Sequence, residues 1–428
     1  MRREWLRVAV MLAALAAQAT PILAQAEFEP LAARLRSPKP ADRIAALRAL
    51  LTSGHPDPLT AAAPTLTDPD NAVQLEAIDT LLTFCLAPAP SPKMAKDFTA
   101  PNGSIAEQVF ESAPLAVLPR QVPPIVVSQL LAATKDDDVR VRVAAAFALG
   151  IFGSPMMGPR ADDTERALVA DLPMSLRHPD PATREALVRS IGKLFEPPPH
   201  ASPPSDITDA VVAALNDSDE RIRLWSSDTL GWLRDPRAAP ALGQRLTFYK
   251  RGDEAWAALH ALARIGLPEN APLFRQYLTD REEEARVMSI EGLGRVRDPA
   301  DVALITESMK NERSPAVLLA GSFAFYLLGA PANLDALVKG LTNPETTHQA
   351  RVYLTELGAQ AAPGLRPYLQ QPDPAVRLAV AEVLGLSGDH DSLGVLEAAA
   401  RDTDAAVGEG VRQALIRLRT LHAGVRVH

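Results

Sequence analysis

Cysteine is almost absent from this chain, which limits the ways in which its fold can be held together. The 428 residues include one cysteine, Cys85, so the chain forms no internal disulfide. Cys85 stands within LLTFCLAP, where we predict a buried, small apolar side chain; a redox or intermolecular role is the alternative. Aromatic residues make up only 5% of the chain, which favours alanine- and leucine-rich helix packing over a β domain with an aromatic core.

Sequence motifs of catalysis and metal binding are missing as well. The eight histidines form no H-E-x-x-H motif and no pair four residues apart, and none has zinc-site spacing to the cysteine. No G-x-S-x-G, phosphate-binding loop or G-x-G-x-x-G sequence occurs. We therefore predict no enzymatic activity, no catalytic residues, no cofactor and no bound metal.

The balance of charge argues against nucleic-acid partners. The formal net charge is −8 at pH 7, from 44 basic and 52 acidic residues. Binding to a phosphate backbone needs a basic stripe, and no cluster of lysine and arginine interleaved with aromatic residues is found. We predict a protein or peptide partner and no nucleic acid, and leave the oligomeric state open.

Residues 1–26 have the pattern of an export signal. Arg2, Arg3 and Arg7 precede an apolar run, and the sequence AQA, ending at Ala26, is a cleavage site of the A-x-A type. Polar residues and a proline interrupt the run, which makes it short for a membrane span, although an uncleaved anchor is the alternative. We predict Sec export, with the twin-arginine route as the alternative. The mature chain would begin at Glu27, have no transmembrane segment and reside in the periplasm or outside the cell.

A recurring segment of about thirty residues organises the rest of the chain. Near-copies of QPDPAVRLAVAEVLG end at Gly150, Gly192, Gly231, Gly294 and Gly385, and weaker copies end at Gly266, Gly329 and Gly358. Successive ends lie 27 to 42 residues apart. In the five strongest copies an arginine lies eight residues before the glycine, and an acidic residue lies four residues before the arginine. These pairs are Asp138 with Arg142, Asp180 with Arg184, Asp219 with Arg223, Glu282 with Arg286, and Asp373 with Arg377.

Each copy has the pattern of two short helices separated by turns. Its apolar residues recur at helical spacing, as in Val376, Val380 and Val383. The acidic residue suits an N-cap, where it can accept hydrogen bonds from free backbone amides. The glycine suits a helix end, and a proline soon afterwards prevents continuation. We therefore predict an all-α fold, in which no unit buries its apolar face without stacked neighbours.

These copies resemble the HEAT family, and in particular its short HEAT-like repeats of the phycobilisome-lyase type. The stretches DPAVRLAVAEVLG (Asp373–Gly385) and DVRVRVAAAFALG (Asp138–Gly150) match the family motif. The resemblance implies a right-handed α-solenoid of about ten to twelve two-helix repeats over residues 27–420, followed by a tail at 421–428. It also implies that the paired acidic residues and arginines form a structural ladder between adjacent repeats.

Two proline-rich insertions, 87–124 and 196–205, interrupt the repeats. Because such sequences cannot continue a helical stack, we predict surface loops, with one short helix around Ser104–Glu111. A tolerated insertion is the simpler interpretation, and a partner-binding flap is the functional one.

By the same resemblance, the second helix of each repeat lines the concave face of the solenoid. Several positions expected to face this groove hold apolar or aromatic residues, and aromatic side chains commonly anchor interfaces. The candidate groove residues are Phe147, Leu224, Trp256, Leu259, Phe325 and Tyr326. A difference of one residue in helical register would place them in the core instead.

The predicted function is that of a non-catalytic scaffold, exported to the cell envelope, that binds a partner helix or peptide in the concave groove. One alternative is a lyase-like or chaperone-like accessory protein for cofactor or enzyme maturation, which only the family resemblance suggests. The other is a structural envelope component that associates with itself through the ends of the solenoid.

Overall fold

The computed structural model describes residues 29–87, 105–112, 114–120, 122–153, 172–196 and 203–424, with side chains as far as 421. The predicted signal peptide lies outside these residues, as do parts of both predicted insertions. The described chain is helical throughout, apart from turns and one isolated antiparallel bridge between Leu86 and Val117. The all-α prediction is therefore confirmed.

The described helices form eleven consecutive pairs, within the predicted range of ten to twelve repeats. The first members are 29–35, α3 (Pro58–Ala62), α6 (Pro124–Ala133), 172–175, α10 (Ser205–Ala214), α12 (Ala239–Tyr249), α14 (Ala271–Tyr277), α16 (Asp301–Ser308), α18 (Leu334–Gly340), α20 (Ala362–Leu365) and α22 (Leu393–Ala399). The second members are α2 (Pro40–Leu50), α4 (Asn71–Cys85), α7 (Val139–Phe152), α9 (Pro181–Leu194), α11 (Glu220–Leu233), α13 (Asp253–Ile265), α15 (Glu283–Val296), α17 (Pro315–Leu327), α19 (Thr347–Leu357), α21 (Pro374–Leu386) and α23 (Ala405–Gly424). One continuous apolar core runs between the two layers along the whole stack.

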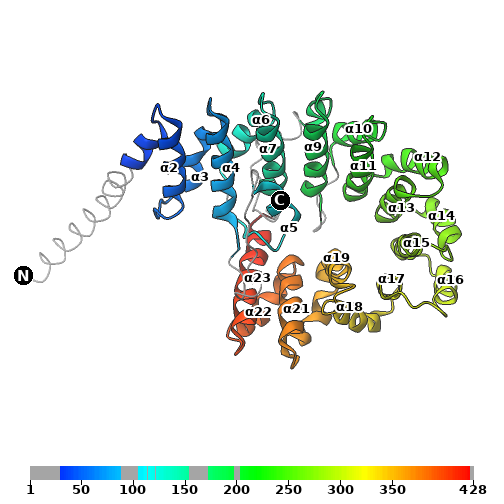
Figure 1. Ribbon diagram of the computed structural model, residues 1–428. Helices are drawn as coiled ribbons and strands as arrows, with labels where there is room; N and C mark the ends of the chain where they lie inside the picture. Colours follow the sequence, from blue (N-terminus) through cyan, green and yellow to red (C-terminus); the bar gives the residue numbers. More distant parts are fainter. Residues whose placement is uncertain are drawn as a thin grey trace, which may run out of the picture.

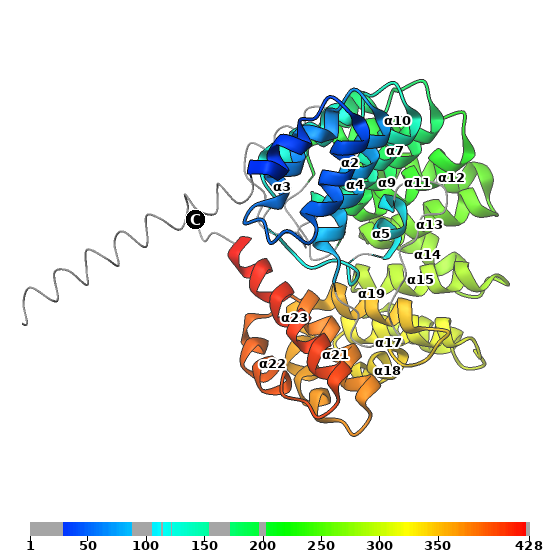
Figure 2. The ribbon, with the colours of Figure 1, turned by 60° about the vertical axis from the view of Figure 1, so that its left-hand side comes forward.

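The solenoid curves until its two halves meet. Figure 1 shows the second helices on the inside of an arc that runs from α4 through α13 to α21, with α23 returning beneath α4 and α5 (Ala106–Ser112). Figure 2 shows the same approach from another side. At the junction the guanidinium of Arg417, 2% exposed, donates hydrogen bonds to the carbonyls of Leu115 and Val117 at 2.8 and 3.1 Å. The arc is therefore closed into a ring by residues about three hundred positions apart in sequence.

The starts of the second helices follow the sequence prediction. Asp138, Asp180 and Asp373 each stand at the N-cap, and each carboxylate accepts a hydrogen bond from a backbone amide of the first turn. These contacts satisfy amides that have no partner within the helix. An acidic residue before an alanine-rich run therefore marks a helix start in this chain.

The glycines near the helix ends differ from the prediction. Gly231, Gly294 and Gly385 lie inside their helices, before the last residue, rather than at the cap. A Cβ atom on Gly294 would lie 2.7 Å from the Cα of Ala324, and one on Gly385 would lie 2.6 Å from the Cα of Ala414. These glycines therefore allow neighbouring second helices to approach closely. Among the predicted helix ends, Gly266 is a left-handed cap, with φ 67°.

The described part of insertion 87–124 is not the surface loop that the sequence analysis predicted. The short helix expected there is present as α5, and Val109 and Phe110 on it are buried against the repeats. Beyond α5, Val117 forms the antiparallel β-bridge with Leu86 at the end of α4. The carbonyls of residues 115 and 117 accept hydrogen bonds from the guanidinium of Arg417. The insertion thus contributes to the core and to ring closure.

Cys85 is buried at the end of α4, in agreement with the predicted apolar environment. Burial raises the pKa of its thiol to about 12, so the thiol stays protonated at neutral pH.

Lys250 ends α12 in a strained backbone conformation, with φ 61° and ψ −41°. A Cβ atom is costly at such angles, whereas glycine tolerates them. We expect Lys250→Gly to raise the free energy of unfolding in urea by about 1 kcal/mol. As a control, Arg412→Gly on the exposed face of α23 should lower it by about 1 kcal/mol. Equal losses in both variants would show that the turn carries no strain.

Candidate functional site

The inner faces of the second helices carry paired polar residues around the repeat glycine. One stands three residues before the glycine and one stands one residue after it, so the two lie one helical turn apart on the same face. The pairs are Arg189 and Lys193 on α9, Asp228 and Trp232 on α11, and Glu291 and Arg295 on α15. None of these six residues is among the candidate groove residues of the sequence analysis, which are all apolar or aromatic.

Arg295 lies at the centre of a cluster of charged and aromatic side chains on the inner face. Its Nε and Nη2 atoms donate to the two carboxylate oxygens of Glu356, each at 2.9 Å, and its Nη1 atom donates to Glu291 at 3.1 Å. The ring of Phe323 lies 5.0 Å from its guanidinium carbon. Because the side chain of Arg295 is 8% exposed, these contacts are shielded from water. The ion pair between Arg295 and Glu356 joins α15 to α19, although α17 lies between these two helices in the sequence of repeats.

Helix α19 completes the cluster from the interior of the ring. Figure 1 shows α19 on the inner side of α18. The hydroxyl of Tyr353 donates to Glu291 at 2.5 Å, and the Tyr353 ring stacks on Phe323 at 4.2 Å. Arg234, at the end of α11, lies 3.3 Å from Glu356. Helices of four repeats therefore meet in one cluster of charged and aromatic side chains.

The charges in this cluster stabilise one another despite burial. Burial alone would raise the pKa of Glu356, but the guanidinium of Arg295, with Arg234 and Arg264, outweighs it and holds the pKa at about 2. The pKa of Arg295 is raised because its two carboxylate partners outweigh the opposing effect of burial. Both groups are therefore ionised at neutral pH, and their ion pair joins α15 to α19.

His260 on α13 adjoins the same cluster but stays neutral. Burial, followed by the positive charge of Arg264, lowers its pKa to about 4, although the carboxylates of Glu291 and Asp228 act in the opposite direction. Asp228 itself pairs with Arg264 at 2.5 Å. The arginine also lies over the ring of Trp232, 3.7 Å from its centroid.

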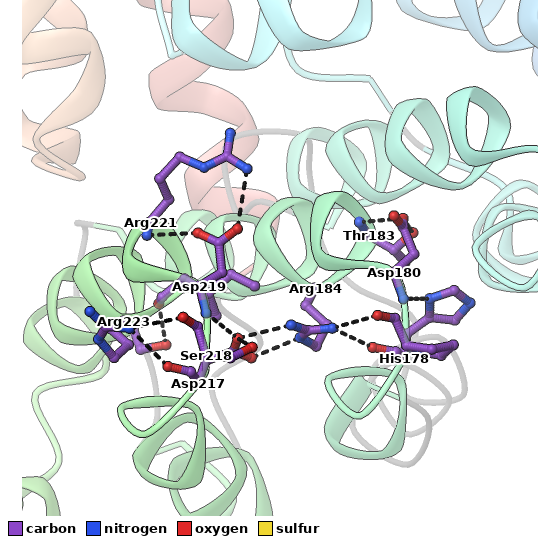
Figure 3. A network of polar contacts seen from close by, with 12 residues as sticks. His178, Asp180, Thr183, Arg184, Asp217, Ser218, Asp219, Arg221 and Arg223 are labelled. Atoms are coloured by element: carbon purple, nitrogen blue, oxygen red, sulfur yellow. Dashed lines mark hydrogen bonds and ion pairs between the residues drawn. The ribbon is translucent and has the colours of Figure 1, made fainter.

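The ladder arginines connect adjacent repeats at the turns. Arg184 donates to both carboxylate oxygens of Asp217, at 2.7 and 2.8 Å, and to the carbonyls of His178 and Pro179 in its own turn (Figure 3). In the same way, each of the other ladder arginines binds a carboxylate of the following repeat: Arg142 to Asp180, Arg223 to Glu254, Arg286 to Glu312, and Arg377 to Asp402. Arg43 binds Asp68 in the same arrangement.

Most of the carboxylates that bind the ladder arginines do not belong to the five acidic residues that the repeat pattern paired with these arginines. Asp138, Asp219 and Asp373 cap their own helices, and only Asp180 both caps a helix and binds the arginine of the preceding repeat. Glu282 makes no cap contact and instead accepts a hydrogen bond from the indole of Trp256 at 2.7 Å. Three of the missed carboxylates, Asp217, Glu312 and Asp402, lie in turns, and Glu254 lies in the first turn of α13.

Most of the candidate groove residues are buried between helices. Phe147, Trp256, Leu259 and Tyr326 are all at most 9% exposed. Trp256 packs edge-on against Tyr277, and the hydroxyl of Tyr326 donates to the carbonyl of Gln360. The remaining two candidates, Leu224 and Phe325, are partly buried. The structure therefore distributes these six side chains along the stack instead of bringing them together in one open groove.

No three His, Cys, Asp or Glu side chains among the described residues are grouped as around a metal ion. None of the helices described combines the length and the apolar character that a membrane span requires.

The sequence model of HEAT repeats matches residues 172–247, 251–322 and 331–416, which together are more than half of the chain. The chain belongs to the HEAT-repeat family. The matched stretches include α11, α15 and α19 of the Arg295 cluster and all ladder arginines from Arg184 onwards. The two-helix unit that the structure repeats is therefore the HEAT unit.

Several solved structures are similar to this HEAT-repeat chain at low sequence identity. Human deoxyhypusine hydroxylase is 21% identical, over 60% of this chain and 96% of that one, with a TM-score of 0.29. The CpcE–CpcF complex of phycocyanin lyase from Nostoc sp. PCC7120 is 20% identical, over 76% and 99%, with a TM-score of 0.37. Importin beta is 11% identical, over 91% and 56%, with a TM-score of 0.36. No protein of curated function matches the chain.

Proposed function

We propose that this HEAT-repeat protein is a non-catalytic scaffold, exported to the cell envelope, that binds a helix or peptide of a partner protein on the inner face of its ring. The observation that carries the proposal is α5, a helix from outside the repeats that is seated on this face against α7 and α9. A surface that holds one short amphipathic helix has the shape and chemistry to hold another.

The remaining inner-face features support a binding role over catalysis. Buried carboxylates and arginines here are paired, and their pKa values favour permanent charge over proton transfer at neutral pH. Families built from this repeat use extended concave surfaces for recognition. Two of the sequence candidates, Leu224 and Phe325, retain part of their surface for such contacts.

Site-specific photo-cross-linking in envelope extracts tests this proposal. A benzophenone side chain would be placed either at Leu224 on the inner helix α11 or at Phe248, 77% exposed on the outer helix α12. We expect a partner to be cross-linked from position 224 and not from position 248.

Other outcomes of the cross-linking experiment would favour other functions. Cross-links from 248 alone, or from neither position, would contradict binding on the inner face. Cross-links between two copies of this chain would instead support the self-associating structural alternative. A pigment or cofactor that copurifies with the chain would support the accessory-protein alternative.

A further inference from the structure

Helix α5 is an addition to the solenoid and not one of its repeats. The repeats on either side of it pack directly on each other, α4 against α7 and α6 against η1 (Ala63–Thr67). Figure 1 shows α5 below α7, on the side of α7 that faces the interior of the ring. The direct contacts among α4, α6, α7 and η1 therefore do not pass through α5, and α5 covers a face that the repeats would otherwise present to the interior.

The apolar contact of α5 is centred on one aromatic side chain. Phe110 lies against the ring of Phe147 on α7, with centroids 4.9 Å apart. It also occupies the space over Gly150, where an added Cβ atom would lie 2.7 Å from the phenyl ring. Because Gly150 has no side chain, the surface of α7 has room there for an aromatic residue from another segment.

The polar contact of α5 is made by two carboxylates one turn apart. Glu107 accepts a hydrogen bond from Arg189 on α9 at 3.1 Å, and Glu111 forms an ion pair with the same guanidinium. The Arg189 side chain is 7% exposed, whereas the two glutamates are 58% and 55% exposed. The arginine therefore belongs to the surface beneath α5, and the glutamates lie at the rim.

The surface beneath α5 has a composition suited to an acidic and aromatic ligand. The guanidinium of Arg189 lies 4.9 Å from the centroid of Phe147 and 4.6 Å from that of Trp225. Without α5 the nearest carboxylate to Arg189 would be Glu185, at 3.9 Å. With α5 in place, Nε of Arg189 is still buried without a hydrogen-bond partner, so α5 does not use all the donors that this surface offers.

We propose that α5 is a tethered occupant of a docking site, formed by Gly150, Phe147, Arg189 and Trp225, that also accepts a partner helix of the same chemistry. The partner helix carries an aromatic residue with carboxylates three residues before it and one residue after it, as Phe110 has in Glu107 and Glu111. Binding in trans displaces α5, because both ligands need the same guanidinium and the same seat over the glycine. This inference rests on the proposed binding function and specifies the site and the partner.

A defined peptide tests the proposal on the full-length chain. The probe is a fluorescent peptide of residues 104–113, SIAEQVFESA, followed by anisotropy. In the wild type, tethered α5 competes at an effective concentration in the millimolar range and should suppress binding. A variant with Glu107→Gln, Phe110→Ala and Glu111→Gln should bind the peptide at least ten-fold more tightly than the wild type.

Matched substitutions separate recognition from non-specific binding. In the α5 variant, adding Arg189→Gln should weaken binding at least ten-fold, whereas Arg412→Gln on the exposed face of α23 should leave it unchanged. A peptide with alanine in place of its phenylalanine should also lose binding. If Phe110→Ala disturbs folding in a thermal melt, the variant Glu107→Gln with Glu111→Gln keeps the apolar seat filled and should still show enhanced binding.

Failure of this proposal is distinguishable from failure of the scaffold function. Peptide binding that is equal in the wild type and the α5 variant, or insensitive to Arg189→Gln, would overturn the docking site. Undetectable binding to a folded α5 variant would do the same. In these cases a partner cross-linked from position 224 would still support binding on the inner face.

Discussion

Lowering the pH from 7 to 4 is expected to reduce the free energy of unfolding by roughly 2–3 kcal/mol through His260 alone. In the folded chain, burial and then Arg264 lower the pKa of His260 from 6.5 to about 4. In the unfolded chain the imidazole binds a proton at its ordinary pKa of 6.5. Between pH 6.5 and 4 the imidazole is therefore protonated in the unfolded state but still neutral in the folded state, and this difference favours unfolding. The stabilisation is complete above pH 6.5 and is lost as the pH falls towards 4.

The groups around His260 come from three helices, and their charges nearly balance. Arg264 lies on the same helix, Asp228 on α11, and Glu291 with Arg295 on α15. The two carboxylates favour the protonated imidazole and the two arginines oppose it, so burial decides the direction of the shift.

Urea unfolding at pH 7.0, 5.5 and 4.0 measures this effect. His260→Gln should reduce the loss of stability between pH 7 and pH 4 by roughly 2–3 kcal/mol while retaining a similar volume. Glu356 begins to contribute a loss of its own at pH 4.0, because its pKa is lowered to about 2 and its stabilisation declines below the ordinary carboxylate pKa of 4.5. This loss is common to both proteins, so the difference between them isolates the imidazole. A wild type and a His260→Gln variant with parallel pH profiles would contradict the assignment.

Removing the guanidinium at the centre of the inner cluster should have the largest effect on stability. Arg295→Ala is expected to lower the free energy of unfolding by about 3–5 kcal/mol, because it leaves buried carboxylates without their partner. Glu291 and Glu356 would be left with less positive charge around them, and Phe323 would lose its cation contact. Chemical denaturation of the folded chain measures the loss.

A double-mutant cycle identifies the cause of that loss. Glu356→Gln in the Arg295→Ala background should cost much less than it does in the wild type, since the carboxylate no longer has a partner to lose. Arg412→Ala, which removes an exposed pair with Glu409, should change stability by less than about 0.5 kcal/mol. Additive losses from Arg295→Ala and Glu356→Gln would indicate that the two residues act independently.

The local parts of the fold could be predicted from the sequence, because each depends on residues a few positions apart. An acidic residue caps the helix that follows it directly, and the ladder arginines bind carbonyls five and six residues earlier in their own turns. The carboxylates that these arginines bind come from the next repeat. Their positions could not be read from a pattern within one repeat, since Glu254 lies in a helix and Asp217 in a turn.

The role of the glycines and of the candidate site needed the tertiary structure. A glycine before a helix end is compatible both with a left-handed cap and with close helix packing, and only the neighbouring Ala324 or Ala414 distinguishes them. Similarly, Trp256 could face a groove or the core, and its contacts with Glu282 and Tyr277 place it within the packed layers.

The sequence by itself determined that this protein is an all-α HEAT-repeat solenoid, because the apolar spacing, caps and turns recur in many of the units and act over short distances. Only the tertiary structure decided that the solenoid closes on itself, that Arg295 reaches Glu356 past a whole repeat, and that α5 occupies the inner face. The physical reason is that each repeat contacts mainly its neighbours and adds a small rotation to the stack. The sum of these rotations determines which distant residues meet, and no local pattern in the sequence records that sum.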